Sequence, residues 1–126
     1  MTSKKKLGQF YTTNYEYILK GFSVPEGSTI IEPFVGQGDL VKWLGPETEV
    51  EAYDIDPRIE ATTRDTLVNP PDYKGKFVIT NPPYLAKNKN KDKTIYEKYD
   101  VDDLYKSFLK SLVDGDVQAG IIIIPL

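Results

Sequence analysis

Residues 120–125 read Gly-Ile-Ile-Ile-Ile-Pro, and this stretch decides the expected fold. Successive residues of a strand point to opposite faces, so consecutive isoleucines make a strand that is apolar on both faces. Such strands are typical of a parallel sheet that helices cover on both sides. We therefore expect an α/β fold in which residues 120–125 form a central strand.

The rest of the chain alternates strand and helix patterns, as a doubly wound sheet requires. Short apolar or β-branched runs predict further strands at 29–31, 50–53, 62–67 and 76–80. Apolar residues three and four apart predict helices over 14–22, 40–44 and 101–112. The expected architecture is a doubly wound, mostly parallel, Rossmann-like sheet that is incomplete at the C-terminus.

Several residues are expected to begin or end these helices. Asn14 is a plausible cap of the first helix, and Asp102 or Asp103 could cap the last one, with Gly115 ending it. Pro57 can occupy the first turn of a helix that follows the second strand.

The composition limits the possible chemistry. The 126 residues fit one domain, 1–126, and they include no cysteine and no histidine. A disulfide framework, a thiolate or histidine metal site, a Ser-His-Asp triad and an imidazole base are therefore excluded, and we expect no metal. With no apolar run of about 18 residues and no signal-peptide pattern, we expect a cytoplasmic protein without membrane contact.

Three polar segments follow predicted strands: Glu32-Pro33-Phe34-Val35-Gly36-Gln37-Gly38, Asp54-Ile55-Asp56 and Asn81-Pro82-Pro83-Tyr84. Ligands of open α/β sheets bind at the carboxyl ends of the strands, where the strand order reverses. The glycines of the first segment allow close backbone approach, but a third glycine and a Gly-Lys-Ser/Thr triplet are missing. A nicotinamide-binding site is therefore weakly indicated, and a nucleotide triphosphatase is disfavoured.

Residues 81–84, which we call the ledge, suggest a site for a planar group with an exocyclic NH₂. Both prolines fix their own φ, and Pro82 restricts Asn81, so the segment is stiff. The Asn81 amide oxygen and a neighbouring carbonyl can accept the two amino hydrogens while Tyr84 covers the ring. The simpler alternative is a strand followed by a proline-rich turn.

Other residues carry two interpretations each. Asp54 is placed to accept hydrogen bonds from ribose hydroxyls. Alternatively Asp54 or Asp56 caps the next helix, and we favour Asp56 for that capping role. Asp65, beside Thr66, could accept from an adenine amino group or belong to a surface turn. The lysines of the segment after the ledge could bind DNA phosphates or be solvated only; they are Lys87, Lys89, Lys91 and Lys93.

Four segments in this order resemble the adenine-specific DNA methyltransferases that use S-adenosylmethionine: 8–12 (Gly-Gln-Phe-Tyr-Thr), 32–38, 54–57 and the ledge. The resemblance implies that Asn81, Pro82, Pro83 and Tyr84 are catalytic. It also implies a cofactor site with the methionine part near Thr12 and Gly36, the ribose at Asp54, the adenine beside Ile55 and Phe34 with its amino group on Asp65, and the sulfonium near Glu32. The implied cofactor residues are Tyr11, Thr12, Glu32, Pro33, Phe34, Gly36, Gly38, Asp54, Ile55, Asp65 and Thr66.

The implied reaction needs no histidine, because hydrogen bonds from adenine N6 to Asn81 and to the Pro82 carbonyl would orient its lone pair. The base would be flipped out of DNA and stacked on Tyr84. Residues 39–80 leave no room for a target-recognition domain, so we expect one after this catalytic segment, or self-association through the unfinished sheet. The alternatives are methylation of a protein glutamine or an RNA adenine, and a non-catalytic module that binds cofactor or a partner. Methylation of DNA in restriction–modification is the leading hypothesis.

Overall fold

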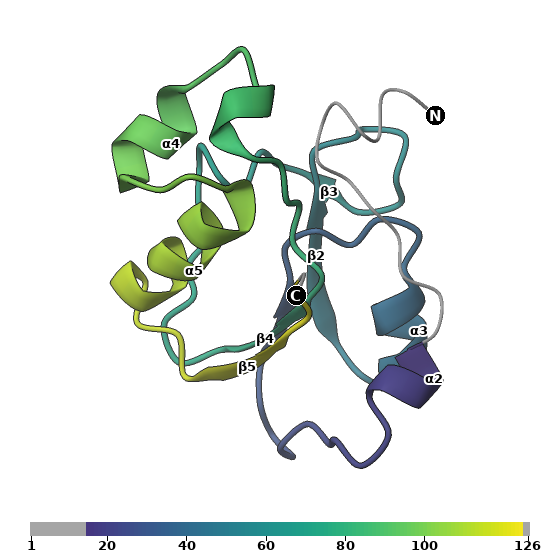
Figure 1. Cartoon of the computed structure of the whole chain (residues 1–126). Helices are drawn as coiled ribbons and strands as arrows, with labels where there is room; N and C mark the ends of the chain where they lie inside the picture. Colours follow the sequence, from purple (N-terminus) through teal and green to yellow (C-terminus); the bar gives the residue numbers. More distant parts are fainter. Residues whose placement is uncertain (1–14, 125–126) are drawn as a thin grey trace.

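The computed structural model describes residues 15–124, which form a five-stranded, all-parallel sheet in the order β3-β2-β1-β4-β5 (Figure 1). The α/β prediction is confirmed, and the arrangement is consistent with a Rossmann-like fold. The strands are β1 (Ile30–Glu32), β2 (Val50–Asp54), β3 (Thr62–Thr63), β4 (Phe77–Thr80) and β5 (Ala119–Ile122). The helices are α2 (Tyr15–Ile18), α3 (Asp39–Leu44), α4 (Thr94–Tyr99), α5 (Leu104–Asp114) and the short 3₁₀ helix η1 (Lys87–Lys89).

Helices cover both faces of the sheet: α4 and α5 lie on one side, and α2 and α3 on the other (Figure 1). The alternation of side chains along the central strands divides the core accordingly. Ile31 and Val78 belong to the apolar cluster under α4 and α5, whereas Ile30, Phe77 and Ile79 belong to the cluster under α2 and α3. The two-sided burial of β1 and β4 is what the parallel-sheet prediction requires.

The longest helix of the described part, α5, follows the predicted spacing and packs Phe108 at the centre of the core. The Phe108 ring makes edge-to-face contacts with Phe34 and Tyr73 at centroid distances of 5.0 and 6.3 Å. Asp103 occupies the capping position, but its side chain does not cap α5, which corrects the expected role. At 11 residues α5 is far too short to cross a bilayer, and no helix within residues 15–124 could do so.

The prediction that residues 120–125 form a central strand is wrong for the described part of the chain. Strand β5 pairs with β4 alone and is an edge strand, so its isoleucines are only partly covered and Ile124 is 45% exposed. The pairing with β4 is close, because a Cβ on Gly120 would lie 2.7 Å from the Val78 carbonyl oxygen.

Other elements also differ from the predictions. Helix α2 ends at Ile18 rather than at residue 22, before Gly21 adopts a φ of +90°. No helix follows Pro57: residues 55–61 form turns, in which the Asp56 carboxylate accepts the backbone and guanidinium N–H groups of Arg58. Strand β3 has only two residues, and the lysine-rich segment contains α4, which the charge pattern concealed.

Candidate functional site

A pocket lies at the carboxyl ends of β1, β2 and β4, where the strand order reverses around β1. This is the position that the sheet topology predicts for a ligand. The pocket residues come from the loops after three strands, from the segment after β3 and from the starts of α2 and α3. They are Tyr15, Glu32, Phe34, Val35, Gly36, Gln37, Asp39, Leu40, Asp54, Ile55, Arg64, Asp65, Thr66, Leu67, Asn81 and Pro83.

The loop between β1 and α3 folds back over the neighbouring strand. Val35 N–H donates to the Tyr53 carbonyl at 2.9 Å, and Gly36 N–H donates to Asp54 Oδ2 at 2.8 Å. Gly36 and Gly38 have φ values of +54° and +81°, a left-handed region that side chains disfavour. The two glycines thus allow the backbone to reach the strand ends.

Asp54, at the end of β2, is buried and holds two loops together. Its Oδ2 accepts Gly36 N–H, and its Oδ1 accepts Asp56 N–H at 2.9 Å. A carboxylate offers about four lone-pair positions, so each oxygen retains capacity for a ligand hydroxyl. Asp54, the residue expected to bind a ribose, therefore also holds the loops of the site in place. Asp56 lies outside the pocket lining.

Glu32 connects the loop after β1 to the ledge. Its side chain is 1% exposed, and its Oε1 accepts Phe34 N–H at 2.9 Å and the hydroxyl of Thr80, the residue before Asn81. Burial, with a smaller contribution from nearby Asp54, raises the pKa of Glu32 from 4.5 to about 8. Glu32 is therefore mainly protonated at neutral pH, and the pocket draws its negative charge from the aspartates.

The segment after β3 supplies one predicted acid and one cation that the sequence did not reveal. Asp65 lines the pocket while its Oδ1 accepts Val68 N–H at 3.3 Å in an exposed turn. Thr66 is buried and donates its hydroxyl to the Pro33 carbonyl at 3.2 Å. Arg64 lies 5.0 Å from the centroid of the Tyr53 ring.

The ledge forms the opposite wall of the pocket. Asn81 and Pro83 line the pocket, whereas Pro82 is almost fully buried and Tyr84 is half-buried outside the lining. Asn81 thus lies on the same cavity as Glu32, which is 49 positions earlier in the sequence.

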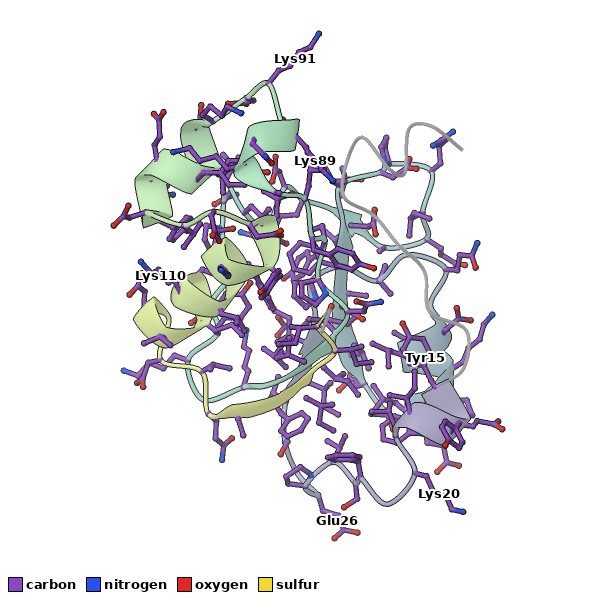
Figure 2. The ribbon with its side chains drawn as sticks, viewed as in Figure 1. Tyr15, Lys20, Glu26, Lys89, Lys91 and Lys110 are labelled. Carbon is purple, nitrogen blue, oxygen red and sulfur yellow. The ribbon has the colours of Figure 1, made fainter. Side chains whose placement is uncertain are left out.

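Most of the predicted site residues meet in this pocket, and some do not. Pro33 and Gly38 support the loop without lining the cavity, and Tyr11 and Thr12 lie outside the described residues. The four lysines predicted to bind DNA also lie outside the pocket lining, and Lys91 extends away from the fold (Figure 2). Lys93 instead turns inward and donates to the carbonyls of Lys87 and Asn90, which fixes the loop.

Several lining residues were not predicted as site residues. The helical spacing of Tyr15 and Leu40 predicts core residues, so it gave no indication that they also line the pocket. Asp39 and Gln37 flank Gly38 and could have been inferred from the segment after the first strand. Arg64 has no sequence signal that separates it from an ordinary surface arginine.

Comparison with known proteins adds no identification to this geometry. No protein-family model matches the chain, and a search of curated proteins finds no match either. No group of three acidic, histidine or cysteine side chains arranged for a metal ion occurs among residues 15–124.

Proposed function

We propose that this chain is the catalytic segment of an S-adenosylmethionine-dependent methyltransferase that acts on adenine N6 in DNA. The observation that supports it most is the convergence of segments 32–38, 54–57 and 81–84 on one pocket. These segments carry the resemblance to adenine-specific DNA methyltransferases, and they are distant in sequence. A strand followed by an ordinary proline turn would not require this convergence.

The residues of the pocket fit the proposed cofactor. Among the lining residues that the structure describes, the acids Asp39, Asp54 and Asp65 outnumber the cations, of which Arg64 is the single example. This charge balance favours a positively charged ligand such as a sulfonium with an ammonium group. Apolar lining side chains offer contact area for an adenine ring; they are Phe34, Val35, Ile55 and Leu67.

On the acceptor side, the ledge residues would hold and orient an amino group. When bound, S-adenosylmethionine would supply an electrophilic methyl group to N6, with the electron pair of the broken S–CH₃ bond left on sulfur and the N6 proton passing to water. Asn81 Oδ1 and the Pro82 carbonyl accept the two N6 hydrogens and direct the lone pair. Such positioning can lower a barrier by about 7–11 kcal/mol without a general base.

The proposed acceptor is a base flipped out of DNA, with Tyr84 beside Pro83 as the stacking surface. Lys89 and Lys91 are exposed on the segment that follows the ledge, where they could contact phosphates. A glutamine amide or an RNA adenine presents the same NH₂ group, so the acceptor must be identified by experiment.

The test begins with calorimetric titration of the protein with S-adenosylmethionine, using NAD as the control ligand. Radiolabelled methyl transfer is then measured onto DNA, RNA and protein acceptors. We expect binding of S-adenosylmethionine alone and label recovered as N6-methyladenine in DNA. Asn81→Ala should lower the rate about 10²–10³-fold, the usual effect of losing a transition-state hydrogen bond, without changing cofactor affinity. Asn88→Ala, at an exposed position in η1, is the matched control.

Each part of the proposal can fail separately. Label on glutamine or RNA would replace the acceptor, and unchanged activity of Asn81→Ala would remove the assigned role of the ledge. Absence of S-adenosylmethionine binding would contradict the cofactor assignment.

A further inference from the structure

The residue immediately after the ledge, Leu85, has both backbone polar groups held by the helical region beyond it. Leu85 N–H donates to Asp103 Oδ1 at 2.9 Å. Its carbonyl accepts the Tyr96 hydroxyl at 2.8 Å and Leu104 N–H at 3.3 Å. The backbone of Leu85 is therefore held by α4 through Tyr96 and by the start of α5 through Asp103 and Leu104.

Asp103 is placed for this contact rather than for its own helix. It occupies the capping position of α5, where an aspartate usually accepts an N–H group of the first turn. Its side chain makes no such bond, and its backbone is extended, with φ −149° and ψ 151°. The carboxylate instead accepts Leu85 N–H, so its hydrogen-bonding capacity serves the segment that follows the ledge.

Tyr96 is the second part of this arrangement. Only 1% of the residue is exposed, and its ring belongs to the apolar cluster under α4 and α5. Its hydroxyl donates to the Leu85 carbonyl and accepts Asn90 Nδ2–H at 3.2 Å. A packed ring with an oriented hydroxyl defines the position of Leu85 more rigidly than a solvent-exposed side chain would.

The preceding end of the ledge is fixed as well. Thr80, which is fully buried at the end of β4, pairs with Ile122 of β5 and donates its hydroxyl to Glu32. Pro82 and Pro83 are buried between these two anchored ends. Because proline fixes φ, the remaining freedom of the ledge is set largely by where Leu85 is held.

We propose that Tyr96 and Asp103 are positioning residues that hold the ledge in place, through Leu85, for the acceptor amino group. The inference rests on the proposed function, because it assigns Asn81 the contact with the acceptor. Neither residue lines the pocket, so both act through the backbone. A displacement of about 1 Å at reacting groups can cost about 10²-fold in rate, so small shifts of Leu85 matter.

The experiment measures kcat, cofactor Kd and melting temperature for Tyr96→Phe, Asp103→Ala and Asp103→Asn. We expect the first two to lower kcat about tenfold or more while cofactor Kd stays within about twofold. Asp103→Asn keeps an oxygen acceptor for Leu85 N–H and should recover most of the activity. Tyr99→Phe, on the same helix, is the matched control, and the amide exchange rate of Leu85 should rise in Asp103→Ala.

The outcomes separate the two proposals. An active wild-type protein with kcat unchanged in Tyr96→Phe and Asp103→Ala would overturn the positioning role and leave the proposed function intact. A fall in kcat accompanied by a similar fold-loss of cofactor affinity and by a lower melting temperature would also overturn the positioning role, because the effect would be structural. A wild-type protein that methylates no acceptor would overturn the proposed function, and this inference with it.

Discussion

The two walls of the pocket are held together in different ways. On the proposed cofactor wall, formed by the loops after β1 and β2, Asp54 both lines the pocket and carries the hydrogen bonds of its own loops. On the ledge wall, Asn81 and Pro83 line the pocket, while Leu85 is fixed from behind by Asp103 and Tyr96. Substitution in the cofactor wall should therefore affect folding and ligand binding together, whereas the ledge wall should allow the two to be separated.

The largest effect is expected at Asp54. Asp54→Ala removes the acceptor of Gly36 N–H and Asp56 N–H as well as the expected ribose contact. Hydrogen bonds to a charged group contribute about 1.5–3 kcal/mol each, so S-adenosylmethionine affinity should fall about 10²-fold and the melting temperature should also fall. Calorimetry and thermal unfolding measure both quantities.

Two further variants complete this comparison. Asp54→Asn, which keeps one acceptor oxygen, should have a smaller effect on both quantities. Asp72→Ala is the control, because Asp72 makes a similar turn contact with Lys74 N–H outside the pocket. Normal cofactor affinity in Asp54→Ala would contradict the shared role.

Glu32 gives the second prediction, a pH dependence of stability. Burial raises its pKa from 4.5 to about 8, so between these values the folded chain retains a proton that the unfolded chain has lost. The stabilisation from this group is complete below about pH 4.5 and is lost as pH rises through about 8. Glu32→Gln cannot ionise and should flatten this fall in urea unfolding measured from pH 5 to 8.5.

The same variant tests the link between the walls. A cation bound in the pocket favours ionised Glu32, so wild-type affinity for S-adenosylmethionine should rise with pH in this range. Glu97→Gln, at an exposed position on α4, should leave both pH profiles unchanged. An equally steep stability profile in Glu32→Gln would show that another group titrates.

The smallest effects are expected for a matched pair of lysines near the ledge. Lys93→Ala removes contacts with the Lys87 and Asn90 carbonyls and should cost about 1–2 kcal/mol of stability. Lys91→Ala changes an exposed side chain and should leave stability unchanged while reducing the salt dependence of DNA binding by about one charge. The reverse result would contradict this division of roles.

The sequence predicted the fold class and the place of the pocket because both depend on local patterns. The buried runs at β1 and β4 are readable from apolar residues, and polar segments at strand ends meet once the strands are parallel. The sequence wrongly predicted β5 as a central strand. Four consecutive isoleucines indicate an apolar strand, but they do not indicate whether it has a neighbouring strand on both sides.

Other features depend on contacts that no local pattern encodes. The role of Asp103 required knowing that Leu85 lies beside the start of α5. The raised pKa of Glu32 depends on its burial at the end of β1, and the inward turn of Lys93 depends on the fold of the segment around it. Charge and spacing alone made Lys93 equivalent to Lys91.

The position of β1 in the sheet has a consequence for the order in which the molecule can form. During synthesis from the N-terminus, β1, β2 and β3 leave the ribosome before Phe77. Until then β1 lacks its β4 neighbour, and its backbone groups on that side have no strand partner. The nascent chain can assemble most of the cofactor wall early, but the complete pocket exists only after Pro83 has emerged and β4 has paired with β1.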